Sequence, residues 1–183
     1  MLGSHTAKLF IEQKEKVVLF DVTPNSATLK AVLKDVMPKP KAVYGDITDI
    51  AKLLEVIKME GVQAIVHTAG ILGEAAEEKP LLALRVNVEG TGNVLEVARL
   101  MDVKKVIFAS SAAVYGPVRK GPITEDNPLK PSTVYGASKL MSEVIGVNYA
   151  RNYGIAFMAL RSPVIYGPGQ SRGLGFASIS AII

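Results

Sequence analysis

The stretch Lys16-Val17-Val18-Leu19-Phe20-Asp21 decides the fold class. Its apolar residues run almost without interruption and end in a carboxylate. A strand with one face in water alternates apolar and polar residues, whereas a strand covered on both faces is apolar throughout. The run therefore predicts a strand of a parallel sheet that is covered by helices on both sides.

Similar runs recur along the chain, and segments with helical spacing separate them. Strands are predicted over residues 42–44, 64–67, 103–110 and 155–160, and helices over residues 6–12, 27–37, 49–59, 80–101 and 133–153. Loops are predicted over residues 70–79 and 116–131. Strands that alternate with helices form βαβ units with right-handed crossovers. The sequence predicts a doubly wound, Rossmann-type parallel sheet that binds a dinucleotide.

Composition excludes several classes of protein. The 183 residues are 49% hydrophobic and 21% charged, as expected for one globular domain. The chain has no cysteine, which excludes disulfides and thiolate metal ligands, and no metal site is predicted. The net charge of +4 is scattered, so we expect no nucleic-acid partner, and no apolar run is long enough for a membrane span. No signal-peptide pattern is present, and a cytoplasmic location is predicted.

Tyr135 and Lys139 lie four residues apart and so share one face of a predicted helix. A lysine ammonium beside a phenol favours the phenolate and lowers the tyrosine pKa toward neutrality. Such a tyrosine exchanges a proton with a hydroxyl or a carbonyl, which hydride transfer to or from a cofactor requires. The alternative interpretation is a packing tyrosine and a solvated lysine.

Ser110 and Ser111 end the predicted strand that precedes this helix. Ligands of parallel sheets bind at the carboxyl ends of the strands. Ser111 would therefore hydrogen-bond the same substrate oxygen that Tyr135 serves. The alternative is a serine that satisfies its own turn.

Two acidic residues are candidates for binding the adenosine half of a dinucleotide. Asp21 ends a strand 18 residues after Gly3, where a Rossmann domain binds ribose hydroxyls. No arginine or lysine falls between Asp21 and Lys30, which favours NAD over NADP. Asp46 would accept from the adenine amino group, with Ile47 against the ring. The alternative for Asp21 is an aspartate that stabilises a turn, and the alternative for Asp46 is a residue that supports the start of a helix.

The remaining candidates follow the third strand or lie in the long helix. The small residues Thr68, Ala69 and Gly70 allow the backbone to approach a cofactor closely. His67 ends an apolar strand and is interpreted as a structural histidine. Asn87 is predicted to order the active site, with plain helix packing as the alternative.

Taken in order, these pieces resemble the extended short-chain dehydrogenase/reductase family, in particular its NAD-dependent epimerase/dehydratase group. The matching pieces are Gly3-Ser4-His5, Leu19-Phe20-Asp21, Gly45-Asp46-Ile47-Thr48-Asp49, His67-Thr68-Ala69-Gly70, Asn87-Val88-Glu89-Gly90-Thr91, Ser110-Ser111-Ala112-Ala113-Val114-Tyr115-Gly116, Tyr135 with Lys139, and Arg161 before Tyr166-Gly167-Pro168-Gly169. The resemblance implies Tyr135 as acid/base, Lys139 as the group that holds the nicotinamide ribose, and Ser111 as the group that positions the reacting oxygen. Ser110, Tyr135 and Lys139 are also expected to contact the cofactor. A homodimer formed through the two long helices is implied as well.

Departures from the family refine these expectations. Of the family's opening strand and Gly-x-x-Gly-x-x-Gly turn only Gly3 is matched, so the first strand is expected to be missing. Residues 1–161 would be the NAD-binding domain and residues 162–183 the start of a substrate-binding part, both truncated. Ala112 and Ala113 replace the acidic pair of dehydratases, which disfavours dehydration. Val164 replaces an asparagine common in nucleotide-sugar epimerases, which weakens the case for a sugar-nucleotide substrate and favours simple alcohol or ketone oxidoreduction.

The sequence therefore predicts an NAD-dependent oxidoreductase or epimerase. Its substrate would be an alcohol, a ketone or a sugar nucleotide that reacts at a hydroxyl-bearing carbon. The alternative from a different class is a non-catalytic fragment or binding module with the dinucleotide fold.

Overall fold

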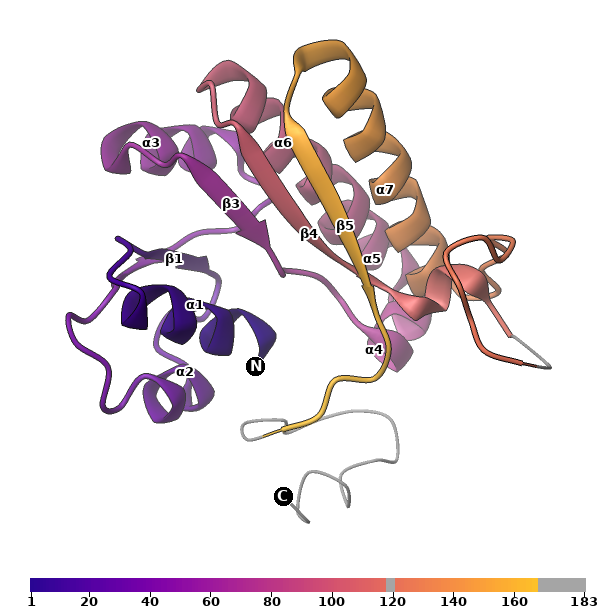
Figure 1. Ribbon diagram of the computed structural model, residues 1–183, viewed down its shortest axis with the longest axis horizontal. Coiled ribbons are helices and arrows are strands. Elements are labelled where there is room, and N and C mark those ends of the chain that lie inside the picture. Colours follow the sequence, from indigo (N-terminus) through magenta and orange to yellow (C-terminus); the bar gives the residue numbers. More distant parts are fainter. Residues whose placement is uncertain (118–120, 168–183) are drawn as a thin grey trace. The chain divides into compact units, whose positions relative to one another are not determined.

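The computed structural model describes residues 1–117 and 121–167 of the chain (Figure 1). The polypeptide divides into two compact units. Among the described residues, one unit is Met1–Asp46 with residues 164–167, and the other is Ile47–Pro163. Most of the predicted substrate-binding segment, residues 168–183, lies outside the described residues.

The first unit is built from two helices and a two-stranded sheet. Its elements are α1 (Leu2–Glu12), β1 (Val18–Asp21), α2 (Ala27–Val32) and β2 (Lys41–Tyr44). Strands β1 and β2 are parallel, with Val18 opposite Lys41. Ile11, Leu33 and Val36 are buried together, with the partly buried Leu19 and Leu29 packed against them. This small apolar cluster holds the two helices together.

The second unit carries a three-stranded parallel sheet in the order β3–β4–β5. Its elements are α3 (Ile50–Glu60), β3 (Ala64–His67), α4 (Gly73–Glu78), α5 (Pro80–Leu84), the π-helical turn η1 (Arg85–Glu89), α6 (Gly90–Leu100), β4 (Lys105–Ser111), the 3₁₀ helix η2 (Ala112–Tyr115), α7 (Val134–Tyr153) and β5 (Ala156–Ser162). Helices α6 and α7 lie side by side and pack on β4 and β5 (Figure 1).

The packing of α7 on the sheet is close because of a glycine. A Cβ added at Gly146 would lie 2.1 Å from the Phe157 Cζ on β5. Phe108, at the centre of β4, is fully buried and its ring stacks on that of Phe157. Burial of such a side chain contributes about 1.5–3 kcal/mol. The helix that bears Tyr135 and Lys139 is therefore fixed firmly against the strands that end near it.

Side chains and glycines set the ends of the helices. The Asp49 carboxylate accepts from the Lys52 N–H at 3.0 Å and caps α3, and the Thr133 hydroxyl accepts from the Gly136 N–H at 3.0 Å and caps α7. Asp and Thr are preferred at this position because their side-chain oxygen accepts from a free N–H of the first turn. Gly61 and Gly154 end α3 and α7 in the left-handed conformation that glycine adopts readily.

The prediction of a parallel α/β fold of Rossmann type is confirmed, and four details differ from the prediction. Helix α2 ends at Val32 rather than residue 37, because Leu33 and Val36 leave the helix to fill the core. Helix α4 occupies a predicted loop, and η1 interrupts the predicted long helix with a π turn. The described strands also pair as two sheets rather than one. Helix α1 precedes the first of these strands, as predicted. No helix of the described part is long and apolar enough to cross a membrane.

Candidate active site

Lys139 is buried beneath the ends of β3 and β4, with only 2% of its surface exposed. Its Nζ donates to the Ala109 carbonyl at 2.9 Å and lies 4.6 Å from the centroid of the Phe108 ring. The Tyr135 ring centroid is 5.8 Å from the same Nζ. Burial lowers the pKa of Lys139 to about 8, because a charged ammonium is poorly solvated there.

The Ser111 side chain lies near enough to the Tyr135 phenol to influence its pKa. Burial raises the pKa of Tyr135 above its ordinary value, and the Ser111 side chain acts in the opposite direction. The expectation that Lys139 brings the pKa of Tyr135 toward neutrality is therefore wrong for this arrangement. The reason is geometric: the ammonium is directed to the Ala109 carbonyl, and desolvation of the phenol dominates.

A glycine allows Ser111 and Tyr135 to approach each other. Gly136 follows Tyr135 directly, and a Cβ added there would lie 2.6 Å from the carbonyl oxygen of Ala113 in η2. The Ser111 Oγ accepts from the Ala113 N–H at 3.1 Å, which ties the serine to the same short helix. The N-terminus of α7 and the segment after β4 are thus in direct backbone contact.

Asn87 fixes the backbone that follows β3. Its Oδ1 accepts from the Ile71 N–H at 2.7 Å, and its Nδ2 donates to the Ile71 carbonyl at 3.0 Å and to the Ser138 Oγ at 2.9 Å. A Cβ added at Gly70 would lie 3.1 Å from the Asn87 Oδ1 and 3.4 Å from the Lys139 Nζ. The backbone at Gly70, which follows Thr68 and Ala69, therefore passes the lysine at close range.

His67 is a buried, neutral histidine in a structural role, in agreement with its interpretation from the sequence. Its Nε2 lies 3.0 Å from the Thr91 hydroxyl, which donates its own proton to the Asn87 carbonyl at 2.5 Å. Since that proton is in use, the histidine Nε2 is the donor of its pair. Burial and the nearby charge of Lys139 lower the pKa of His67 to about 3.

Sequence reasoning missed Glu77 of α4, whose carboxylate accepts from the Tyr135 N–H at 3.1 Å and the Val134 N–H at 3.2 Å. A carboxylate at a helix N-terminus satisfies free N–H groups and interacts favourably with the helix dipole. Ser138 was missed as well, and its hydroxyl donates to the Tyr135 carbonyl at 2.8 Å. The glutamates near Pro80 were a visible signal, but their segment was interpreted as a loop.

The other predicted cofactor residues are distributed over both units. Gly3 lies in the first turn of α1, and the exposed Asp21 Oδ1 accepts from the backbone and the hydroxyl of Thr23 at 2.7 and 3.0 Å, a turn arrangement. Asp46 follows β2 in the same unit. In the second unit Ile47 is buried, and Ser110 donates to a carboxylate of α7. Among the described residues no cluster of three potential metal ligands is present.

Comparison with known proteins shows one consistent family. A family model described as the NAD dependent epimerase/dehydratase family matches residues 1–182. The UDP-glucose 4-epimerase of Lactobacillus helveticus is 33% identical over 175 residues, which are 95% of this chain and 52% of the relative. The chain thus spans about half the length of the curated relatives it matches.

Two solved structures illustrate the structural likeness. The UDP-glucose 4-epimerase from Brucella ovis, in complex with NAD, is 35% identical with a TM-score of 0.79, and the match covers 91% of this chain and 48% of that one. The L-threonine dehydrogenase from Cupriavidus necator is 26% identical with a TM-score of 0.82, over 96% of this chain and 55% of that one.

Proposed function

Because this chain belongs to the NAD-dependent epimerase/dehydratase family, we propose that it is the NAD-binding part of a sugar-nucleotide epimerase. Residues 1–161 would form the NAD-binding domain, and the residues that follow would begin the substrate-binding part. The observation that carries the proposal is the Tyr135 ring beside the buried ammonium of Lys139, with Ser111 near enough to the phenol to lower its pKa. Such a set can move the proton of a substrate hydroxyl while the carbon that bears this hydroxyl is transiently oxidised.

The residues near Lys139 fit a dinucleotide. Because Gly70 has no side chain, its backbone passes close to an ammonium that has further protons to donate, and Asn87 keeps that backbone rigid. In the first unit, Gly3 lies in the first turn of an 11-residue helix, whose free N–H groups suit a pyrophosphate. Asp21 would bind the adenosine ribose, and Asp46 with Ile47 the adenine.

NAD supplies the hydride acceptor when it is bound, and the chain's own residues handle the proton. Tyr135 would take the proton of the substrate hydroxyl and return it to the carbonyl oxygen, while Ser111 would hold that oxygen. The form of Tyr135 that takes this proton is the phenolate, which burial disfavours, and the form that returns it is the phenol, which burial favours. The Ser111 side chain favours the phenolate.

A homodimer formed through α7 is part of the proposal. Met141, Val144 and Val147 lie three residues apart along α7, with exposed fractions of 51%, 58% and 41%. An apolar stripe at this spacing on a helix is suited to packing against another helix. We expect Val144→Glu to give a monomer in light scattering, with the wild type as the dimeric reference. A wild-type monomer would contradict this part of the proposal.

The test combines calorimetric titration with NAD and detection of reduced cofactor after addition of UDP-glucose. We expect NAD binding by wild type and by Tyr135→Phe alike, with reduced cofactor formed by the wild type only. Absence of NAD binding, or equal reduction by Tyr135→Phe, would overturn the proposal. The likeness to an L-threonine dehydrogenase favours simple alcohol oxidation as a second candidate, so L-threonine is included as a competing substrate. Reduction with threonine alone would select that candidate.

A further inference from the structure

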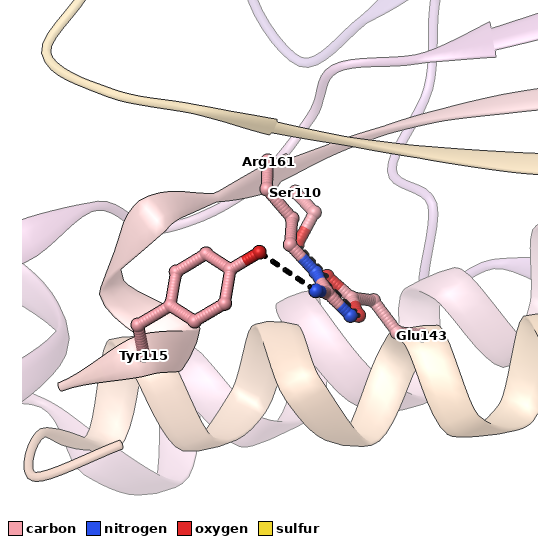
Figure 2. A network of polar contacts seen from close by, with 4 residues as sticks. All are labelled: Ser110, Tyr115, Glu143 and Arg161. Atoms are coloured by element: carbon pink, nitrogen blue, oxygen red, sulfur yellow. Dashed lines mark hydrogen bonds and ion pairs between the residues drawn. The ribbon is translucent and has the colours of Figure 1, made fainter. Parts of the chain in front are cut away.

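A partly buried ion pair lies outside the proposed catalytic set (Figure 2). Arg161 of β5 donates from Nη2 to the Glu143 Oε2 at 2.8 Å and from Nε to the Glu143 Oε1 at 3.1 Å. The side chains of Arg161 and Glu143 are 24% and 7% exposed. This fork-like geometry fixes the direction of both groups as well as their distance.

The ion pair contacts the Ser111 segment at both of its ends. On one side, the hydroxyl of Ser110 donates to the Glu143 Oε1. On the other side, Arg161 Nη1 donates to the hydroxyl of Tyr115, the last residue of η2, at 2.9 Å. Figure 2 shows the phenol of Tyr115 directed toward the guanidinium. Ser111 thus lies between two anchors that share one ion pair.

The same ion pair reaches the helix that bears the other two predicted catalytic residues. Glu143 lies four residues after Lys139, so the two side chains leave α7 from one face. Lys139 is bonded to the Ala109 carbonyl and Glu143 to the next residue of β4, Ser110. Arg161 lies opposite Ser110 in the register of β4 and β5. Four elements, β4, η2, α7 and β5, therefore meet at these two charges.

A contribution to stability alone does not account for such a pair. Burial of the Glu143 carboxylate and partial burial of the Arg161 guanidinium remove much of their hydration, and apolar residues of similar volume often stabilise a protein as well or better. A fully bonded polar network does, however, specify one geometry. We infer that Glu143 and Arg161 are positioning residues that hold Ser111 within hydrogen-bond reach of Tyr135. The catalytic meaning of that geometry rests on the proposed function.

Amide hydrogen exchange on the free chain tests the inference. The reporter is the Ala113 N–H, which donates to the Ser111 Oγ. The double variant Glu143→Leu with Arg161→Met removes both charges without leaving one unpaired, and Tyr115→Phe removes only one anchor. We expect exchange at Ala113 to become roughly tenfold faster in the double variant and a few-fold faster in Tyr115→Phe, as expected for loss of charge-assisted hydrogen bonds.

The chain offers a matched control of the same residue types. Arg99 donates to Glu96 at 2.6 Å, and Tyr149 donates to the same carboxylate at 3.0 Å. Glu96→Leu with Arg99→Met should leave exchange at Ala113 unchanged. Wild-type exchange in Tyr115→Phe, or in a folded double variant, would overturn the inference.

The readout needs neither cofactor nor substrate, so its outcome is separate from that of the proposed function. If the variants exchange faster at Ala113 while the wild type shows no turnover, the positioning role stands and only the enzymatic assignment is lost. If the double variant does not fold, Tyr115→Phe alone decides, because it removes a single hydroxyl and retains the aromatic ring.

Discussion

Replacement of Lys139 by methionine is expected to stabilise the chain at neutral pH. The wild-type ammonium is only 2% exposed, and its burial lowers the pKa from 10.5 to about 8. A pKa difference of this size corresponds to about 3 kcal/mol of unfavourable free energy in the folded state. Methionine has a similar length and no charge, so this unfavourable term disappears.

Part of the gain is offset by a lost contact. Lys139 donates to the Ala109 carbonyl at 2.9 Å, and a charged hydrogen bond contributes about 1.5–3 kcal/mol. The net stabilisation at pH 7 is therefore about 1 kcal/mol.

The pH dependence is the sharper part of the test. The folded pKa of Lys139 lies below the unfolded one, so the folded state loses this proton first as the pH rises. Between pH 8 and 10.5 the unfolded chain holds more of this proton than the folded chain does. The contribution of Lys139 to the unfolding free energy of the wild type therefore increases with pH in this range. Below pH 8 the unfavourable term is fully present.

Urea unfolding followed by circular dichroism, for wild type and Lys139→Met at several pH values, measures both effects. The stability difference between them should favour methionine at pH 7 and reverse as the pH passes from 8 toward 10. A variant less stable than wild type at pH 7, with a difference that does not change with pH, would refute the reasoning.

The remaining predictions concern residues around the lysine. Because the folded pKa of His67 is about 3, its protonation weakens the fold as the pH falls below 6.5, by up to about 5 kcal/mol, and His67→Gln should shift the acid unfolding midpoint to lower pH. Asn87→Asp replaces a donor of two hydrogen bonds and should lower the unfolding free energy by about 3 kcal/mol in urea. Gly136→Ala should lower the unfolding free energy by about 1–3 kcal/mol, because the added Cβ would meet the Ala113 carbonyl, and a lower melting temperature would show this. Gly92→Ala, with open space at its Cβ in α6, is the matched control and should stabilise by about 0.5–1 kcal/mol. Equal effects of the two alanines would contradict the packing argument.

Local signals in the sequence were sufficient for the strands and for most helix ends. The apolar run of β3 ends where predicted, at His67, because strand length and burial leave a clear pattern over a few residues. Helix α4 left no such pattern: Glu74, Glu77 and Glu78 surround a single buried position, Ala76. A six-residue helix with one buried residue has too little periodicity to be recognised.

The candidate site was less predictable because its electrostatics depend on contacts between distant parts of the chain. The spacing of Tyr135 and Lys139 places them on one helix face, but it does not say where the ammonium is directed. That direction is set by the Ala109 carbonyl, 30 residues away. The sign of the Tyr135 pKa change follows from burial by the surrounding elements, and no local motif contains that information.

The geometry of the site depends on two separate sets of contacts that converge on the start of α7. Asn87 ties the backbone after β3 to Ser138, whose hydroxyl donates to the Tyr135 carbonyl. Glu77 binds the Tyr135 N–H from another direction. A tyrosine whose N–H and carbonyl are both held by side chains of the site has a fixed backbone, from which its ring is aimed. Since transfer of a proton requires placement within a fraction of an ångström, these contacts matter as much to the proposed chemistry as the phenol itself.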